Sequence, residues 1–364
     1  MQILTLNIGS SSIKYKVFDE NIVCVSSDSI SGIGTNLCSW PDVKNQTEAM
    51  QKLASELIGL GYAPDLICHR VVHGGNYFQA PVIIDQEVMN KIAELGDLAP
   101  LHNPIQHDAI KNAIAFFPAA KQIAFFDTAF HSSMPESQTL IPINYGSEIK
   151  RYGFHGLNYA YISEQLTYEF HKPVNAIICH LGNGASVCAI KNGKSYATSM
   201  GMTPNDGLIM GTRSGAIDSG VIAYLARTRN MSISEIDQVL NNKSGLFAIA
   251  GSSDMRECEE LAIKGDFNAK KAIAAFTERV RFYIGGYSAL VGDIDCLVFT
   301  GGIGENSSYI RNKILDNLSG YYLDNKKNMA NHKGIISAEN SNRVMIINAN
   351  EEKYMATLAL KFLH

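Results

Sequence analysis

Two stretches of this chain follow the same plan: a short apolar strand, a small glycine-containing turn and a returning strand. In the first, residues 3–6 are apolar, residues 7–12 read NIGSSS, and residues 13–18 alternate apolar and polar side chains. In the second, the apolar run 176–179 leads into HLGNGAS at residues 180–186. Glycines let the backbone turn sharply and bring its N–H groups close to an anionic ligand. The repeat indicates an internal duplication whose two turns would grip the phosphates of a nucleotide, although either turn alone also fits an ordinary hairpin.

Length and composition favour a globular protein of two domains. The 364 residues exceed what a single hydrophobic core usually spans. Hydrophobic residues make up 46% of the chain and charged residues 18%, which fits a packed core rather than disorder. The net charge of -4 gives no reason to expect nucleic acid or an anionic membrane as a partner.

The cysteines and the absence of targeting segments point to the cytoplasm. The 7 cysteines include no CxxC pair, and several lie within or beside apolar strand-like runs, where a thiol acts as a small hydrophobe. This usage is typical of a reducing compartment. The N-terminal sequence does not have the pattern of a signal peptide, and no stretch approaches the roughly 20 apolar residues of a membrane span. We therefore expect a soluble cytoplasmic protein.

Charged side chains stand at the ends of two apolar runs. Arg70 lies near the end of the run 66–72, which a pair of glycines follows, and Asp127 directly follows the run 122–126. Open α/β sheets place active-site groups at the C-terminal ends of their strands. The alternatives are a surface ion pair for Arg70 and a turn cap for Asp127.

Two further basic residues lie in glycine-punctuated loops. His155 belongs to RYGFHG at residues 151–156, and Arg213 belongs to GTRSG at residues 211–215. Small neighbours leave a guanidinium room to reach an anion. A structural hydrogen-bonding role for His155 and a solvated loop position for Arg213 remain the alternatives. None of the histidines has metal-ligand spacing such as HExxH, so we predict no zinc site.

The rest of the chain alternates strand and helix patterns. We expect a loop over 26–40 and helices over 106–117, 158–170 and 268–291. The stretch 300–306, TGGIGEN, is expected to form a glycine turn between a strand and a helix that begins at 308. That context suits a nucleotide, but its spacing matches neither GxGxxG nor a P-loop.

Collected in chain order, these motifs resemble those of the acetate kinase family, within the duplicated superfamily of sugar kinases, Hsp70 and actin. The resemblance extends from Asn7 to Glu352 and rests on these stretches: LNIGSSSIKY, HRVVHGG, LAPLHNP, FDTAFH, RYGFHG, HLGNGAS, MGMTP, GTRSG, SSDMR, FTGGIGENS and NEE. It implies an α/β protein with a two-domain, duplicated actin-like/sugar-kinase ATPase fold and a nucleotide cleft between the domains that closes on substrates. The implied activity is reversible, Mg²⁺-dependent transfer of the γ-phosphate of ATP to acetate, giving acetyl phosphate and ADP by direct in-line transfer.

The resemblance also implies roles for four catalytic residues. Arg70 and Arg213 would orient acetate and the phosphoryl group, and His155 with Arg213 would stabilise the in-line transition state. Asp127 matches the family's catalytic carboxylate. Acetate needs no deprotonation at neutral pH, so we expect Asp127 to orient an arginine or a metal-bound water rather than to move a proton.

The other implied contacts concern the metal, the nucleotide and the methyl group of acetate. Mg²⁺, or Mn²⁺ in its place, would be bound directly or through water by Asn7 and Glu351. The phosphate side of ATP or ADP would be contacted by residues of the two duplicated segments: Lys14, Ser10, Ser12, His180, Leu181, Gly182, Asn183 and Gly184. The adenosine would be held by residues of two later motifs: Asp254, Met255, Arg256, Gly302, Ile303, Gly304, Glu305 and Asn306. The acetate methyl would enter a small apolar pocket: Val72, Leu101, Phe154 and Pro204.

By the same resemblance, residues 1–131 and 353–364 form an N-terminal actin-like ATPase domain. Residues 132–352 form a C-terminal domain for nucleotide binding and dimerisation, and the protein is a homodimer. Three departures from the family pattern stand out. Ala216 replaces the usual Asp, from which we expect a changed ion pair near Arg213. Ile8 replaces a small residue, and the stretch 246–250 is compressed.

Three rival functions remain open. A propionate or butyrate kinase on the same scaffold would differ from an acetate kinase by only about 1–3 kcal/mol per methylene. A chaperone or filament ATPase of the superfamily would lack the group of Arg70, Asp127, His155 and Arg213, which this chain has. A catalytically dead nucleotide sensor is favoured only by Ala216.

Overall fold

The computed structural model describes residues 1–9, 12–35 and 38–362, and the chain divides into two compact units. Unit 1 consists of Met1–Ser132 and Asn350–His364, and unit 2 consists of Ser133–Ala349. The sequence placed residues 350–352 with the second domain, whereas here they group with unit 1. A local reason is that Lys16 contacts both Asn350 and Glu352.

Unit 1 is built on a six-stranded mixed sheet in the order β3-β2-β1-β4-β6-β5. β1 is antiparallel to β2 and parallel to β4, and β4 is parallel to β6. The strands span β1 Gln2–Ile8, β2 Ser12–Asp19, β3 Cys24–Ser31, β4 Leu66–Val71, β5 Val82–Ile83 and β6 Lys121–Phe126.

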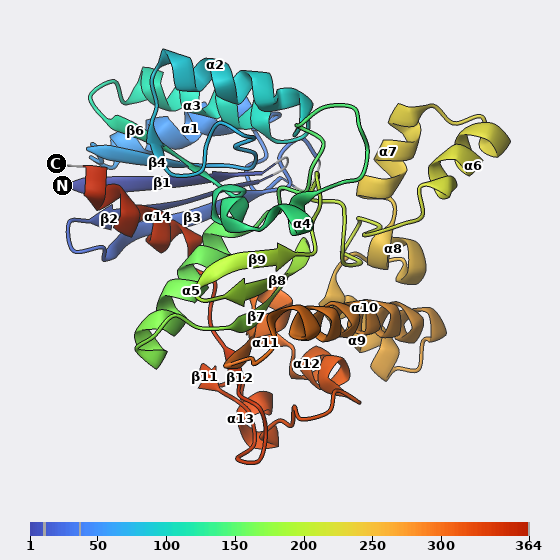
Figure 1. Cartoon of the computed structure of the whole chain (residues 1–364). Coiled ribbons are helices and arrows are strands. Elements are labelled where there is room, and N and C mark those ends of the chain that lie inside the picture. Colours follow the sequence, from blue (N-terminus) through green and yellow to red (C-terminus); the bar gives the residue numbers. More distant parts are fainter. Residues whose placement is uncertain (10–11, 36–37, 363–364) are drawn as a thin grey trace. The chain divides into compact units, whose positions relative to one another are not determined.

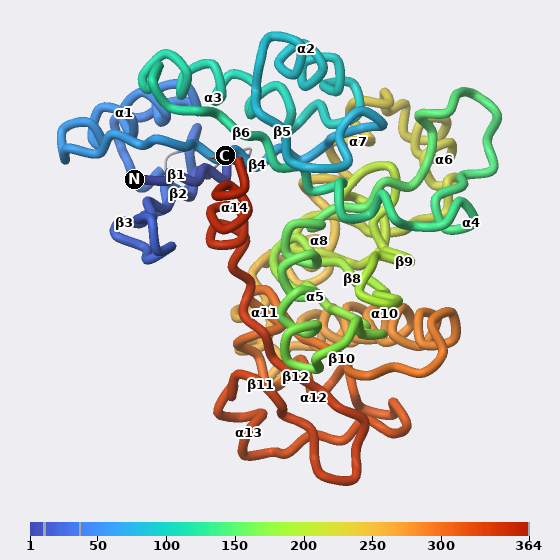
Figure 2. The backbone as a smooth tube through the Cα atoms, turned by 60° about the vertical axis from the view of Figure 1, so that its left-hand side comes forward, coloured from blue at the N-terminus to red at the C-terminus, as the bar shows by residue number. Residues whose placement is uncertain are grey.

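Helices cover both faces of this sheet (Figure 1). They are α1 Gln46–Gly59, α2 Gln86–Glu94, α3 Asn103–Phe116 and α14 Glu351–Ala359, with short 3-10 turns at Leu95–Asp97, Ala129–Ser133 and Leu360–Phe362. α1 and α3 lie on one face, where Leu53 and Ala113 pack with Leu6 and Tyr15 in the core. α14 packs on the other face, against β1, β2 and β4. Both chain ends therefore lie in unit 1, as Figure 2 shows.

Unit 2 holds a second six-stranded sheet in the order β11-β12-β10-β7-β8-β9. β7 is antiparallel to β8 and parallel to β10. The strands span β7 Ala176–Leu181, β8 Ala185–Lys191, β9 Lys194–Thr198, β10 Cys296–Thr300, β11 Gly334–Ile335 and β12 Val344–Ile346. Four neighbouring strands, β9-β8-β7-β10, repeat the pattern β3-β2-β1-β4 of unit 1, and this confirms the predicted duplicated α/β fold.

The helices of unit 2 follow in chain order, and the longest has 25 residues. They are α4 Glu136–Thr139, α5 Gly156–Phe170, α6 Gly220–Arg229, α7 Ile233–Asn242, α8 Gly245–Ala250, α9 Met255–Ile263, α10 Phe267–Val291, α11 Gly301–Asn306, α12 Ser308–Leu315 and α13 Asn325–Met329. α10 packs against β7 and β8 and presents an apolar face to them, including Phe276 and Val280.

Three elements differ from the sequence predictions. β3 continues to Ser31, where a loop was expected, because it pairs with β2 and buries Ile30. α3 begins at Asn103 rather than at 106, because Pro104 is tolerated in the first helical turn. Residues 301–306 were expected to form a turn but are helical in α11, with only Gly301 at positive φ.

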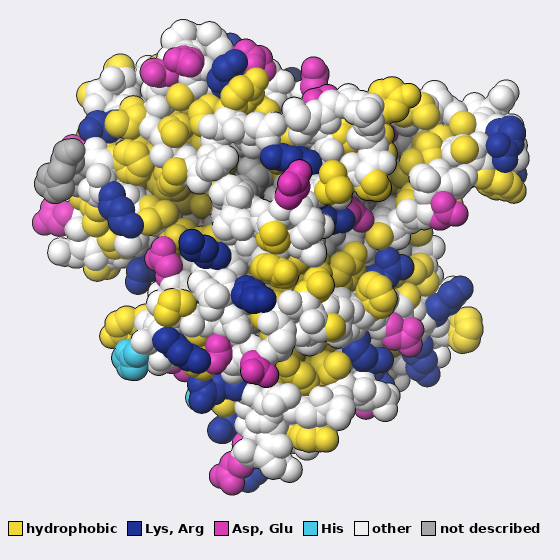
Figure 3. All heavy atoms as spheres, in the orientation of Figure 1, with side chains coloured by type: hydrophobic (Ala, Val, Ile, Leu, Met, Phe, Trp, Pro, Cys, Tyr) yellow, Lys and Arg dark blue, Asp and Glu magenta, His cyan; other side chains and the backbone are white. Residues whose placement is uncertain are grey.

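Some surface and composition features bear on function. On the face drawn in Figure 3, basic Lys and Arg side chains are interspersed with acidic Asp and Glu side chains. All seven cysteines are free, and five of them are buried. No helix within the described part of the chain has both the length and the apolar character needed to cross a bilayer.

A buried histidine of β4 makes the stability of the fold depend on pH. His69 is 2% exposed, and its ring Nε2 lies 2.8 Å from Oε1 of Gln122. Burial lowers the pKa of His69 from 6.5 to about 4, and the hydrogen bond to Gln122 opposes this shift only in part. The unfolded chain therefore takes up a proton below pH 6.5 that the folded chain does not, so the stability falls as the pH drops from 6.5 towards 4.

We predict that His69→Gln flattens this pH dependence. Between pH 6.5 and pH 5, the free energy of unfolding of the wild type should fall by about 2 kcal/mol more than that of the variant. Urea unfolding at both pH values measures this difference, and comparing slopes cancels any constant effect of the substitution. Parallel profiles for the two proteins would show that His69 does not stay neutral in the folded state.

Candidate active site

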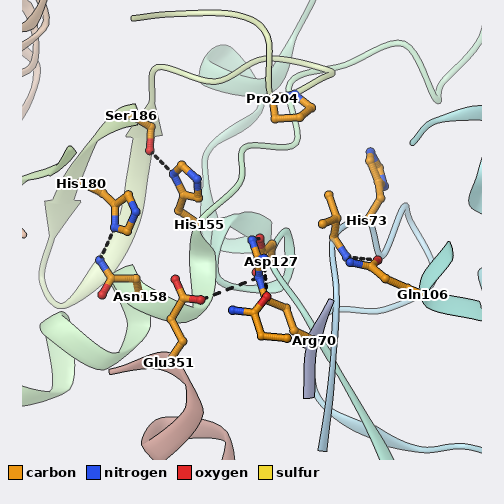
Figure 4. Close-up of polar contacts among 12 residues, drawn as sticks. Arg70, His73, Gln106, Asp127, His155, Asn158, His180, Ser186, Pro204 and Glu351 are labelled. Carbon is orange, nitrogen blue, oxygen red and sulfur yellow. Dashed lines mark hydrogen bonds and ion pairs between the residues drawn. The ribbon is translucent and has the colours of Figure 1, made fainter. Parts of the chain in front are cut away.

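An ion pair between a partly buried arginine and a buried aspartate joins the ends of two neighbouring strands in unit 1. Arg70, near the end of β4, donates from Nε to Oδ1 of Asp127 at 2.9 Å and from Nη2 to Oδ2 (Figure 4). Asp127 follows β6, is 1% exposed, and has its backbone N–H bound to the carbonyl of Val71. Burial alone would lower the pKa of Arg70, but the carboxylates of Asp127 and Glu351 raise it above its ordinary value. Arg70 thus remains a fixed cation.

Two oxygen-bearing side chains flank this pair in unit 1. Asn7, on β1, accepts a hydrogen bond through Oδ1 from Nη1 of Arg70 at 2.9 Å. Glu351, in the first turn of α14, lies 3.8 Å from Nε of Arg70. Burial raises the pKa of Glu351 to about 7; Arg70 opposes this, and the nearby charges of Asp127 and Glu352 add to it. The carboxylates of Asp127, Glu351 and Glu352 therefore carry more negative charge than Arg70 alone neutralises.

The donor set around Asn7 and Glu351 fits Mg²⁺. Amide and carboxylate oxygens are the ligands that this ion prefers, and it usually keeps several waters and substrate phosphates. In the described ranges, no three His, Cys, Asp or Glu side chains are arranged to hold a metal by themselves. A cation here would therefore be completed by water and by phosphate oxygens.

The apolar residues predicted in unit 1 have different environments. Val72, one residue beyond β4, is 4% exposed, and Leu101, in the loop before α3, is 45% exposed. Val72 follows Arg70 by two residues and lies in a bend just beyond the end of β4.

The first duplicated turn is only partly described. Lys14 is exposed on β2 and pairs in the sheet with Asn7. The carbonyl of Ser12 accepts from the N–H of Gly9 at 2.9 Å, which closes the turn. Ser10, which we predicted to contact the nucleotide, lies outside the described residues.

In unit 2, a left-handed residue presents an imidazole at the start of α5. His155 is the N-cap of α5 with a φ of 59°, and its Nδ1 lies 2.8 Å from Oγ of Ser186 on β8 (Figure 4). A Cβ placed on Gly184 would lie 3.5 Å from Nε2 of His155 and 3.6 Å from Nη1 of Arg213. Glycine at 184 therefore leaves a small space that borders the imidazole of His155 and the guanidinium of Arg213.

The neighbours of this space are held in place by further hydrogen bonds. Arg213 donates from Nη1 to the carbonyl of Pro204 at 3.0 Å. His180 lies at the end of β7, and the centroid of its imidazole is 4.3 Å from that of His155. Nδ2 of Asn158 lies 2.9 Å from Nδ1 of His180. Phe154, which precedes His155, is 1% exposed. His155 and Arg213 thus border Gly184, while His180 contacts His155 and Pro204 contacts Arg213.

Six of the eight predicted adenosine residues of unit 2 line a cavity of about 840 Å³. It is lined by residues of three stretches of the chain, 182–183, 253–263 and 302–307: Gly182, Asn183, Ser253, Asp254, Met255, Arg256, Glu259, Glu260, Ile263, Gly302, Ile303, Asn306 and Ser307. Such a volume suits a nucleoside-sized ligand.

Three predicted nucleotide residues have structural contacts and do not line this cavity. Oε1 of Glu305 accepts from the N–H of Gly301 and from that of Ala349, both at 2.9 Å. The carbonyl of Gly304 accepts from Nη1 of Arg311 at 2.8 Å. Leu181 is fully buried at the end of β7.

Residues 2–357 match the model of the Acetokinase family. An acetate kinase of Thermoanaerobacterium thermosaccharolyticum is 41% identical over 98% of this chain and 97% of its own length. The crystal structure of a propionate kinase from Francisella tularensis is 40% identical with a TM-score of 0.92, covering 98% of both chains. An acetate kinase from Porphyromonas gingivalis is 33% identical with a TM-score of 0.89, covering 100% of both chains.

The chain belongs to the acetokinase family. This confirms the family that the motifs predicted, and with it the assignment to the kinases. The family match spans both units, because it covers nearly the whole chain.

Several residues around the acetokinase site were missed by sequence reasoning. Lys16 reaches Glu352 at 3.4 Å, and Arg151 binds the carbonyl of Met200 and the carboxylate of Asp206, which together hold the loop of Pro204. Arg311, 0% exposed, anchors α11 as described above. Side chains alternate between the two faces of β2, so Lys16 lies on the same face as Lys14. This alternation was a signal from which the sequence could have predicted Lys16. The sequence near Arg151 and Arg311 contains no pattern that predicts the contacts of these two residues.

The left-handed conformation of His155 yields a stability prediction. A residue with a Cβ costs roughly 1 kcal/mol more than glycine in this conformation. Both His155→Gly and His155→Ala lose the imidazole, so we expect the glycine variant to be the more stable by about 1 kcal/mol. Thermal or urea unfolding of the two variants measures the difference.

The matched control lies on the same helix. Gln165 is exposed within α5, where Gln165→Ala should be more stable than Gln165→Gly by about 1 kcal/mol. The order at position 155 is thus opposite to the order at position 165. The same order at both positions would rule out the left-handed start of α5.

Proposed function

We propose that this protein is an acetate kinase that transfers the γ-phosphoryl group of ATP directly to acetate. An oxygen of the acetate carboxylate forms the new bond to the γ-phosphorus. The bond from that phosphorus to the β–γ bridging oxygen breaks, and ADP leaves with its electron pair. Family membership supports the reaction class, and the observation that carries the acceptor is Arg70, a partly buried, fixed cation that Asp127 aligns two residues before the apolar Val72.

The proposed chemistry requires positioning and charge neutralisation rather than a base. A carboxylate acceptor is ionised at neutral pH, so no proton has to be removed before the attack. Both oxygens of Asp127 are already bound by Arg70, which supports an orienting role for Asp127. Arg70 would bind the acetate carboxylate, and Val72, Leu101, Phe154 and Pro204 would receive its methyl group.

The phosphoryl group would be stabilised by His155 and Arg213. Their nitrogens border the same space next to Gly184, which supports their acting on one anionic group. Donors that are fixed before the reaction lower the barrier without having to reorganise. The cavity lined by Asp254 and Ile303 would hold the adenosine, and the turns of β1–β2 and β7–β8 would hold the phosphates.

A divalent ion would be held on the acidic side of unit 1. Asn7 and Glu351 would bind Mg²⁺, or Mn²⁺, directly or through water. When bound, the ion neutralises charge on the nucleotide phosphates. Glu352 and Lys16 would support Glu351 by fixing the start of α14.

Homodimerisation and a cytoplasmic location are also proposed. α6 buries none of its residues and exposes Val221 and Tyr224, and Phe282 on α10 is 72% exposed. Apolar side chains on the surface of unit 2 support a subunit interface there. Seven free cysteines support a reducing compartment. Light scattering tests the dimer directly.

We predict that the purified protein with ATP and Mg²⁺ forms an acyl phosphate that hydroxylamine traps, with the strongest signal for acetate among acetate, propionate and butyrate. The panel of acids is needed because the Francisella relative is called a propionate kinase. Arg213→Ala is the control; its signal should fall by at least about 100-fold, as is typical when a transition-state donor is removed.

Each outcome of this assay is informative. Signal only with the longer acids would move the proposal to a propionate or butyrate kinase on the same scaffold. A lack of signal with any acid, while ATP still binds, would overturn the kinase proposal and favour a nucleotide sensor.

A further inference from the structure

A buried glutamine connects the ends of two strands that carry candidate active-site residues. Gln106, on the first turns of α3, is 2% exposed. Its Oε1 accepts from the N–H of Val72 at 2.9 Å, and its Nε2 donates to the carbonyl of Ile8 at 3.0 Å. We call this arrangement, Ile8–Gln106–Val72, the amide bridge; Gln106 and its bond to the backbone are drawn in Figure 4.

The two ends of the amide bridge depend on Gln106 to different degrees. Ile8 is still held by β1, because it pairs with Ile13 on β2. Val72 lies one residue beyond β4, whose pairing with β6 ends at Val71, so its N–H has left the sheet. A buried N–H that loses its acceptor costs about 1–3 kcal/mol, so the backbone at Val72 would move to find another partner. Removing the glutamine amide should therefore displace Val72 more than Ile8.

A second amide supports the next residue in the same way. Oδ1 of Asn103 accepts from the N–H of His73 at 3.1 Å, and its Nδ2 donates to the carbonyl of His73 at 3.0 Å. Asn103 is fully buried at the start of α3. Side chains at the start of α3 thus hold the backbone of Val72 and His73, two successive residues that lie beyond the paired part of β4.

The position of Val72 matters because Arg70 lies two residues before it. With Arg70 holding the carboxylate of acetate and Val72 bordering its methyl group, the distance between them sets how long an acyl chain fits. We propose that Gln106 is a positioning residue that determines acyl-chain specificity, by fixing the backbone of Val72 relative to Arg70. This inference rests on the proposed function, because it requires a carboxylate substrate at Arg70.

The test compares Gln106→Met with the wild type. Methionine has nearly the same length and volume but cannot bridge the two backbone groups. We expect the KM for acetate to rise about tenfold, as for loss of one buried hydrogen bond. We also expect the ratio of kcat/KM for propionate to that for acetate to rise at least about fivefold, because one methylene is worth that much in such a pocket. The KM for MgATP should stay within about twofold.

Three further variants make the test specific. Burial favours the protonated acid in Gln106→Glu, which keeps an acceptor for the N–H of Val72 and an O–H donor for Ile8, so this variant should retain the acetate KM within about threefold. Asn112→Ala, on the same helix, removes an amide whose Nδ2 donates to the carbonyl of Asp108 in that helix, and should leave every parameter unchanged. In a Val72→Ala background, Gln106→Met should add little to the propionate preference, because Gln106 acts through Val72.

The outcomes separate this inference from the proposed function. An inactive wild type would overturn the proposed function. If the wild type is active and the folded Gln106→Met protein has unchanged selectivity for propionate over acetate, the amide bridge does not determine acyl-chain specificity, and this inference is overturned. Equal increases in the KM for acetate and for MgATP would show general loosening and would also overturn it. If the methionine variant does not fold, Gln106→Ala leaves room for water at both groups and should raise the propionate ratio in the same direction.

Discussion

The ion pair between Arg70 and Asp127 is the constraint on which the candidate site depends. It joins the C-terminal ends of β4 and β6, and it fixes a guanidinium where Asn7 and Glu351 also converge. A buried charge without its partner costs several kcal/mol, so each member requires the other. Because Arg70 takes both oxygens of Asp127, the carboxylate that accepts a phosphoryl group in our proposal comes from the substrate and not from the protein.

The duplication explains how one topology supplies two kinds of site. In unit 1 the strands β1, β4 and β6 end close to an amide, an arginine and an aspartate respectively, which suit a carboxylate and a metal. In unit 2 the pattern β9-β8-β7-β10 ends in His180, the glycines of HLGNGAS and the start of α11, next to a nucleoside-sized cavity. Strand ends are positions where side chains can change without disturbing the sheet, and this allows the two halves to diverge in chemistry.

The sequence predicted the fold class, the family and the residues that form the two clusters, because each motif is a short segment whose glycines and charged residues lie together in the chain. It did not predict the amide bridge or the burial of Arg311. Both depend on helix side chains that reach backbone groups of distant segments, and a single amide or guanidinium in a helical pattern does not reveal its partner. The extension of β3 and the helix at 301–306 were missed because strand pairing and packing outweighed local loop and glycine preferences.

The central claim is that phosphorus passes directly from ATP to the substrate carboxylate, with no phosphorylated side chain between them. The most direct test is the stereochemical course at a γ-phosphoryl group made chiral with oxygen isotopes. A single in-line transfer predicts inversion of configuration in the acetyl phosphate formed. Retention would indicate two successive displacements through a phosphorylated residue, and would contradict the structural role that we assign to Asp127.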